Sequence, residues 1–246
     1  MQRYFLENVE VVNNYISIEG NDFHHIKNVM RMKIDDLVYV CFDSLTYIAK
    51  ISQFLPDKVN LELVEKLDKD VELKVDITIA HGLVRREKME EVIRRICELG
   101  AHEYIPVMMA RSIVKIKDSK DSKIQRQKTI IKEACEQSHR NRLMEITEAL
   151  EFKKFIELSK NYDLCLFAYE ESGRSNNYNL KKYLKEFKGK NILVLVGPEG
   201  GFSEHEVEVL EKNGFYSVGL GPRILRTETA PLYVMSAISY ELEIGE

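Results

Sequence analysis

The sequence predicts an α/β protein in two parts, a small β-rich domain followed by a larger domain with a parallel sheet. In residues 1–66, strand-like runs are short and closely spaced, which is typical of a small barrel. From residue 75 onward, strands alternate with amphipathic helices, which indicates a parallel sheet. Residues 192–196 form an unbroken apolar run, typical of a strand buried on both faces. We therefore predict domains at 1–70 and 71–246.

In the first part, one helix interrupts the strands. We expect this helix over 24–32, with His25, Ile26, Val29 and Met30 on one side, after a turn over 19–22 that contains Gly20. The expected strands cover residues 3–6, 15–18, 37–42, 46–51 and 59–64.

The second part contains its own start and stop signals. Ser203 and Glu206 have the spacing of a capping box, Gly214 fits the end of that helix, and Pro231 fits the first turn of the last helix. The polar segment 170–179 is expected to be a mobile loop. The expected strands cover 75–80, 104–108, 163–169, 192–196 and 215–220, and the other expected helices cover 87–99, 121–139, 153–158 and 180–187.

Composition indicates a soluble cytosolic protein. The chain is 44% hydrophobic and 31% charged, and no apolar run approaches the length of a membrane span. The N-terminus has no apolar core of a signal peptide. The four cysteines are far apart, as expected of reduced and mostly buried thiols, and the histidines show no metal-binding spacing. We expect no metal and no membrane association.

Charge is unevenly distributed along the chain. The net charge is −4, and residues 1–70 carry 8 basic and 12 acidic side chains. Residues 111–142 carry ten basic and four acidic side chains, a balance of +6, which is compatible with a phosphate-binding stripe or with a solvated helix face. The basic residues of this stripe are Arg111, Lys115, Lys117, Lys120, Lys123, Arg126, Lys128, Lys132, Arg140 and Arg142.

Two glycine-containing turns follow predicted strands near the C-terminus. The first is GPEGGF, from Gly197, and the second is GPRILR, from Gly221. Turns at the carboxyl ends of parallel strands are where open α/β sheets bind ligands. Neither turn matches a P-loop or a dinucleotide-binding glycine motif, so the sequence does not predict a nucleotide phosphate site of either kind.

The two turns resemble the paired signatures of the RsmE family. GPEGGFSEHE and LGPRILRTETA occur in the family's order, and HHIKNVMRMKIDD and EQSHRNR resemble two further family segments. The resemblance implies a PUA-like barrel followed by a SPOUT methyltransferase domain with a trefoil knot. It implies S-adenosylmethionine as cofactor, N3 of one uridine in 16S ribosomal RNA of the 30S subunit as acceptor, and a homodimer.

The resemblance also assigns residues to roles. It implies catalysis by Arg226 and Glu228, with an internal Arg–Glu clamp as the alternative, and RNA contact by Arg3, Arg31, Gln137, Arg140 and Arg142. For Arg31 the alternative is an ion pair with Asp35 or Asp36. The implied cofactor-binding residues are Leu195, Gly197, Glu199, Gly200, Leu220, Ile224, Leu225 and Ala230.

Two other functions remain open at this point. A SPOUT methyltransferase acting on transfer RNA or on another ribosomal base would keep the same glycine turns. A non-catalytic RNA-binding assembly factor would not need an intact cofactor pocket. The chain departs from the family at Leu143-Met144, where a proline is expected, which leaves the shape of that loop open.

Overall fold

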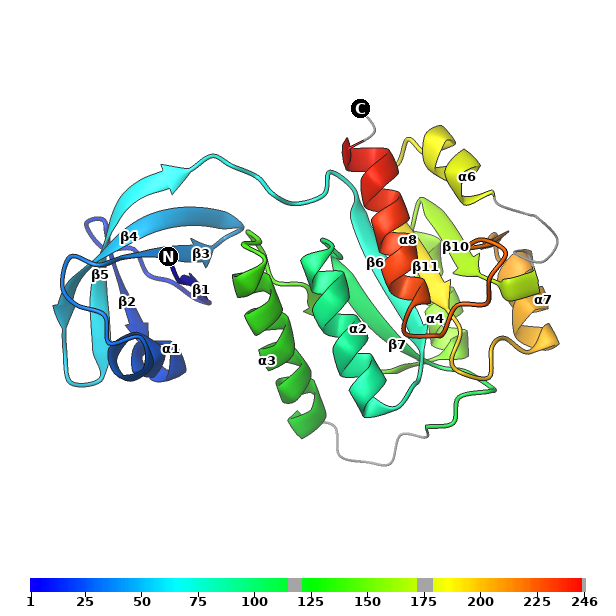
Figure 1. The fold of residues 1–246 in the computed structure, drawn as a ribbon, viewed down its shortest axis with the longest axis horizontal. Coiled ribbons are helices and arrows are strands. Elements are labelled where there is room, and N and C mark those ends of the chain that lie inside the picture. Colours follow the sequence, from blue (N-terminus) through cyan, green and yellow to red (C-terminus); the bar gives the residue numbers. More distant parts are fainter. Residues whose placement is uncertain (115–120, 172–178, 245–246) are drawn as a thin grey trace. The chain divides into compact units, whose positions relative to one another are not determined.

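The computed structural model describes residues 1–114, 121–171 and 179–244, except for the side chains of 121–123. The chain forms two compact units (Figure 1). The first unit comprises Met1–Glu72 and Cys135–Leu143, and the second comprises Leu73–Ala134 and Met144–Glu246. The first unit thus includes a short segment, Cys135–Leu143, that the sequence assigns to the second domain. The predicted mobile loop falls mainly on 172–178, outside the described residues.

The first unit is a five-stranded mixed sheet with the strand order β1-β3-β4-β5-β2. The pair β1–β3 is parallel and the other pairs are antiparallel. Irregular register between β4 and β5 bends these strands, which helps a small sheet to curl around its own core. The strands are β1 (Arg3–Phe5), β2 (Tyr15–Glu19), β3 (Leu37–Phe42), β4 (Leu45–Phe54) and β5 (Lys58–Leu67).

The helix of the first unit differs from the prediction. It begins at Gly20, as α1 (Gly20–His24), and continues as the π-helix η1 (His25–Val29), so the expected turn over 19–22 is wrong. Ile26 is fully buried, whereas Val29 and Met30 are 58% and 39% exposed. The wider π turn changes the angular spacing of side chains, so the assumed α-helical period does not place these residues on one face.

The second unit is built on a seven-stranded sheet in which every pair is parallel. The strand order is β12-β10-β11-β6-β7-β8, and β9 also pairs with β7. The strands are β6 (Asp76–Gly82), β7 (Glu103–Met108), β8 (Glu145–Ile146), β9 (Leu150–Glu151), β10 (Leu164–Ala168), β11 (Asn191–Val196) and β12 (Tyr216–Val218). The helices are α2 (Arg86–Glu98), α3 (Asp121–Gln137), α4 (Phe152–Leu158), η2 (Ser159–Asn161), α6 (Leu180–Glu186), α7 (Glu204–Lys212), α8 (Ala230–Ser239) and η3 (Tyr240–Ile244).

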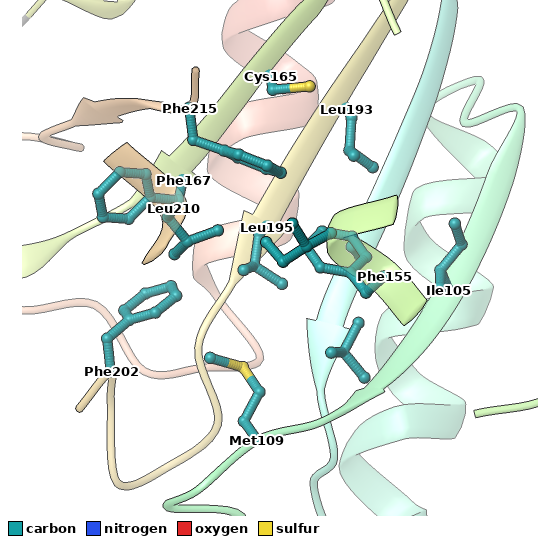
Figure 2. Packing of buried hydrophobic residues seen from close by; sticks show 13 residues of the cluster. Ile105, Met109, Phe155, Cys165, Phe167, Leu193, Leu195, Phe202, Leu210 and Phe215 are labelled. Atoms are coloured by element: carbon teal, nitrogen blue, oxygen red, sulfur yellow. The ribbon is translucent and has the colours of Figure 1, made fainter. Parts of the chain in front are cut away.

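Both faces of this sheet are buried, as the apolar run of β11 predicts. Leu193 and Leu195 pack on one side in a cluster with α4 and α7, and α2 and α8 lie next to each other on the other side (Figure 1). Phe202 and Met109 extend this cluster to the end where β11 leaves the sheet (Figure 2). The core therefore supports the loop that follows β11.

The predicted capping box is present at the start of α7. Ser203 accepts a hydrogen bond from the Glu206 N–H, and the Glu206 carboxylate accepts one from the Ser203 N–H. Glu206 also accepts a hydrogen bond from the Ala110 N–H at 2.8 Å, which ties the helix start to the segment after β7. None of the helices in the described part of the chain is long and apolar enough to cross a membrane.

Candidate active site

A pocket lies in the second unit at the carboxyl edge of the parallel sheet. Because β6, β10 and β11 run in the same direction, their C-terminal ends meet at this edge. The pocket has a volume of about 600 Å³, within the range of small-molecule sites. Its lining comes from the ends of β10 and β11, from the segment after β7, from both glycine turns with the residues that follow the second, and from the start of α2. The residues are Lys88, Arg111, 168–171, 196–202, 224–228 and Ala230.

Glycine is required where backbones meet at this edge. A Cβ on Gly82, at the end of β6, would lie 2.5 Å from the Pro198 nitrogen, and one on Gly200 would lie 2.8 Å from the Arg111 Cβ. Real side chains do not tolerate such distances. The first glycine turn thus packs closely against both β6 and the segment after β7. These contacts fix the position of the turn in the pocket wall.

A buried hydrogen-bond chain joins the two glycine turns to the sheet. The Thr227 hydroxyl donates to the Gly197 carbonyl oxygen at 2.7 Å, so its oxygen accepts from the His81 Nε2–H at 2.7 Å. Nδ1 of His81 then accepts from the Tyr104 hydroxyl at 3.0 Å. These donors and acceptors assign His81 as the neutral Nε2–H tautomer.

Burial keeps His81 neutral, and the stability of the folded protein therefore depends on pH through this residue. Desolvation lowers the pKa of His81 from 6.5 to about 4, against the opposing effects of the Glu228 carboxylate and of the Thr227 backbone. Below pH 6.5 His81 is protonated in the unfolded chain but stays neutral in the folded chain. The free energy of unfolding therefore falls as the pH drops toward 4. We expect the free energy of unfolding to fall by about 2 kcal/mol between pH 7 and pH 5 from this residue alone.

Urea unfolding of the wild type and of His81→Gln at both pH values measures this contribution. The glutamine variant should be less stable at pH 7 and should lack this part of the pH dependence. An equal loss of stability in both proteins would contradict the assignment.

Charged side chains from three elements meet in the pocket wall. Lys88 Nζ, from α2, lies 3.0 Å from Glu228 Oε2 and 3.5 Å from Glu199 Oε1. Glu228 Oε1 lies 3.9 Å from Arg226 Nη1, a loose contact that leaves the Arg226 side chain 84% exposed. Burial raises the pKa of Glu228, but its own backbone N–H and the Lys88 ammonium more than offset this, so the pKa lies below its ordinary value. Glu228 is therefore a carboxylate at neutral pH.

Most of the predicted cofactor-binding residues line this pocket. Gly197, Glu199, Gly200, Ile224, Leu225 and Ala230 do so. Leu220 lines a smaller cavity of about 60 Å³, and Ile224, Leu225 and Ala230 line both cavities. Leu195 lines neither cavity and is fully buried in the core cluster. This is the core packing that the sequence allows as the alternative for Leu195, and its contact with the cofactor stays a prediction of the family resemblance.

The pocket suits a polar organic cofactor with hydrogen-bond donors. Glu199 Oε2 is buried and lacks a hydrogen-bond partner among the described residues, which is a costly state that a ligand hydroxyl or ammonium group would relieve. The amino and hydroxyl groups of S-adenosylmethionine are such donors, and the volume is sufficient. In the described part of the chain, no group of three or more His, Cys, Asp or Glu side chains could hold a metal ion.

Two residues predicted to contact RNA are buried within the first unit. The Arg3 guanidinium donates to the Arg140 carbonyl at 2.5 Å and lies over the Tyr39 ring. The Arg140 side chain pairs with Glu72. Arg3 and Arg140 are only 7% and 3% exposed. In this structure both side chains anchor the Cys135–Leu143 segment, and RNA contact by either residue stays a prediction.

The other three predicted RNA contacts are accessible. Arg31 and Gln137 are exposed, and Arg142 is half-buried with Nε 3.4 Å from Glu72 Oε2. Arg31 makes no ion pair with Asp35 or Asp36 in the described residues; the Asp36 carboxylate accepts from the Lys33 N–H instead. Arg31 has a φ of +52°, a left-handed conformation that arginine rarely adopts. These three residues stay candidates for RNA contact.

The basic stripe of residues 111–142 is partly neutralised by ion pairs. Arg126 forms a bidentate pair with Glu90, and Arg140 and Arg142 both contact Glu72. Lys115, Lys117 and Lys120 lie outside the described residues, as does the side chain of Lys123. In the part that the structure describes, three arginines thus have carboxylate partners, which weakens the reading of the stripe as a continuous phosphate-binding surface.

The sequence does not predict a role for Lys88 in the pocket wall or for His81 behind it. Lys88 lies on a helix that the sequence predicts correctly, but its partners are more than a hundred positions away. His81 is 146 positions from Thr227. The sequence offered one local signal, a lysine in the first turn of α2, where the helix dipole disfavours a cation.

Known methyltransferases resemble this chain in sequence and in structure. A model of an RNA methyltransferase domain matches residues 71–239, and one of an RNA methyltransferase PUA domain matches residues 18–63. Ribosomal RNA small subunit methyltransferase E of Bacillus subtilis is 40% identical, with 99% of this chain and 98% of that protein covered. The Neisseria gonorrhoeae enzyme of the same name, solved with S-adenosyl methionine, is 25% identical with a TM-score of 0.85 over 98% of each chain. A Legionella pneumophila putative methyltransferase in complex with the cofactor SAM is 25% identical with a TM-score of 0.84 over 97% of each chain.

Fold, pocket and domain matches together define an RNA methyltransferase that carries a PUA domain. The parallel-sheet unit with its two glycine turns is the SPOUT type of methyltransferase domain that the sequence predicts, and the mixed sheet is the PUA-like domain. Within this class, the chain belongs to the ribosomal RNA small subunit methyltransferase E family, RsmE. The trefoil knot and the residue roles remain predictions from the family resemblance.

Proposed function

We propose that this protein transfers a methyl group from S-adenosylmethionine to N3 of one uridine in 16S ribosomal RNA. The observation that carries the proposal is the pocket between the two glycine turns, where Glu199 presents a buried carboxylate oxygen that has no donor among the residues that the structure describes. The B. subtilis relative is named for small-subunit ribosomal RNA, and the N. gonorrhoeae relative binds S-adenosyl methionine. The wider proposal is that the 30S subunit is the substrate and that the enzyme acts as a homodimer.

The proposed chemistry requires an acceptor nitrogen without its proton. S-adenosylmethionine supplies an electrophilic methyl group on a sulfonium sulfur. Neutral uracil carries a proton on N3, so the protein must favour loss of that proton. The exposed Arg226 guanidinium would stabilise the anion that develops on the ring, and the Glu228 carboxylate would accept the proton or orient Arg226. The Glu228 backbone N–H and the Lys88 ammonium lower the pKa of Glu228, so this carboxylate is ionised and can take either role.

Methyl transfer from labelled S-adenosylmethionine tests the function directly. The substrates are unmethylated 30S subunits, with free 16S RNA and transfer RNA alongside, and mass spectrometry identifies the modified nucleoside. The expected product is 3-methyluridine on 30S subunits. Methylation of transfer RNA alone, or of another base, would move the enzyme to a different substrate, and cofactor binding without any transfer would favour a non-catalytic assembly factor.

Arg226→Lys is expected to slow methyl transfer while it leaves cofactor binding intact. Lysine keeps the charge but lacks the planar, two-pronged donor geometry of arginine. We expect the single-turnover rate on 30S subunits to fall by about 10- to 100-fold, with calorimetric affinity for the cofactor unchanged. Arg95→Lys, at an exposed position on α2, is the matched control. Full activity of Arg226→Lys would show that the arginine is not needed for catalysis and only shapes the turn.

The proposed homodimer has a candidate surface on the C-terminal helices. Tyr233 on α8 and Tyr240 and Ile244 on η3 are exposed, while Val234, Met235 and Ile238 are buried. The sequence of α8 is apolar nearly all round, and such a helix is buried in the core, at an interface, or both, so a second copy on the tyrosine side would cover its exposed residues. Sedimentation velocity distinguishes the 28.7 kDa monomer from a particle of twice that mass.

A further inference from the structure

Lys88 occupies an unusual position for a lysine. It lies in the first turn of α2, where the partial positive charge of the helix N-terminus disfavours a cation. Its side chain is about one-third exposed and forms part of the pocket wall. Other basic residues of this helix, such as Arg86 and Arg95, form ion pairs with glutamates of the helix itself, whereas Lys88 contacts two glutamates from outside it.

One of these carboxylates lies in the first glycine turn, and the other lies in the segment that directly follows the second glycine turn. Glu199 belongs to the turn after β11, and Glu228 belongs to the turn before α8. The Lys88 ammonium lies 3.5 Å from the first and 3.0 Å from the second. Without a cation between them, two carboxylates this close to one ammonium would repel each other and separate the turns. Lys88 therefore spans the gap between the two halves of the pocket.

We propose that Lys88 is a positioning residue that holds the two glycine turns at the separation required for cofactor binding. It acts through Glu199 and Glu228 on the open side of the pocket, while Thr227 and Gly197 join the same turns on the buried side. The shared ammonium also directs one Glu199 oxygen toward Lys88 and leaves the other, which is buried and has no hydrogen-bond partner in the described part of the chain, to a ligand donor. This inference rests on the proposed cofactor of the enzyme and deepens it.

A positioning role and a simple charge role predict different binding results. S-adenosylmethionine carries a sulfonium charge that S-adenosylhomocysteine lacks, while their other polar groups are the same. If Lys88 contributed only its charge, Lys88→Met would make the site more negative and would strengthen binding of the sulfonium compound. If Lys88 positions the turns, both compounds lose affinity together, because both depend on the same carboxylate and backbone groups.

Isothermal titration calorimetry of both compounds with the full chain distinguishes these roles. For Lys88→Met we expect a loss of about tenfold or more for both compounds, and a smaller loss for Lys88→Arg, which can still span the carboxylates. Arg86→Met is the matched control, because it removes a cation two residues before Lys88 on the same helix. The partner of Arg86, Glu90, keeps its ion pair with Arg126, so this variant should bind both compounds as the wild type does. Unchanged affinity of Lys88→Met for both compounds, or tighter binding of S-adenosylmethionine alone, would overturn the proposal.

A second measurement needs no cofactor. Carbon-13 NMR of labelled glutamate side chains follows the ionisation of Glu228, which pairs with Lys88 and Arg226, shares Lys88 with Glu199 and interacts electrostatically with His81. Loss of the ammonium in Lys88→Met should move the Glu228 titration to higher pH, and an unmoved titration would contradict the contact. If the wild type failed to bind S-adenosylmethionine, the proposed cofactor would be wrong, while this titration would still decide whether Lys88 holds Glu228.

Discussion

Replacing Gly200 with valine is expected to abolish cofactor binding while the protein stays folded. A Cβ at this position would lie 2.8 Å from the Arg111 Cβ and 2.9 Å from the Arg111 carbonyl oxygen, and both residues line the pocket. The branched side chain would therefore displace the turn, the Arg111 segment or both. Because a shift of about 1 Å is enough to break hydrogen bonds to a ligand, we expect affinity to fall by about 100-fold or more.

The fold should survive because Gly200 itself is exposed and the sheet beneath the turn is independently packed. Calorimetry with S-adenosylmethionine and a thermal melt of the same sample measure the two effects separately. Gly201→Ala is the matched control: Gly201 has a φ of +69° and open space around it, so alanine there adds backbone strain without a clash. Retained affinity in Gly200→Val would count against this pocket as the cofactor site.

Local sequence patterns predict the framework of this site well. The apolar run of β11, the Ser203–Glu206 capping box and the Gly214 helix end are each encoded within a few residues, and all three occur as predicted. The paired motifs likewise place both glycine turns at one pocket. In these places local propensity and tertiary structure agree, so short-range rules are sufficient.

The sequence does not reveal the contacts that join residues far apart along the chain. Lys88, His81 and Gly82 contact turns more than a hundred residues away, and their own surroundings look like an ordinary strand and helix. The same limitation applies to two arginines that the sequence predicts to contact RNA, a role that stays a prediction. A charged residue is normally read as exposed, but Arg3 and Arg140 are buried by polar partners that only the folded chain brings to them.

The ion pair between Arg140 and Glu72 provides the second large expected effect. Both side chains are less than one-tenth exposed, and Glu72 also accepts hydrogen bonds from the backbone N–H groups of Asn141 and Arg142. Burial raises the pKa of Glu72, but the Arg140 guanidinium and these N–H groups lower it below its ordinary value, so the carboxylate stays charged. Arg140→Met would leave this charge buried without its main partner. We expect the first unit to lose about 3–5 kcal/mol of stability.

Hydrogen exchange of the β3 and β4 amides measures this loss within the first unit. Lys50→Met is the matched control, because it breaks an ion pair with Glu62 in the same unit that is more than one-third exposed and should change stability by less than about 1 kcal/mol. The double variant Glu72→Leu, Arg140→Met replaces the pair with apolar groups and should regain much of the lost stability. A single variant as stable as the wild type would show that the pair is not the anchor we describe.

The same double variant separates the anchoring role of Arg140 from the predicted RNA contact. If Arg140 only anchors Cys135–Leu143, then 16S RNA affinity should fall with stability in Arg140→Met and return with it in the double variant. Exposed Gln137 and half-buried Arg142 would then remain the candidates of this segment for RNA contact. A double variant that is stable but still binds RNA weakly would instead assign Arg140 to the RNA interface, and its burial would have to be relieved when RNA binds.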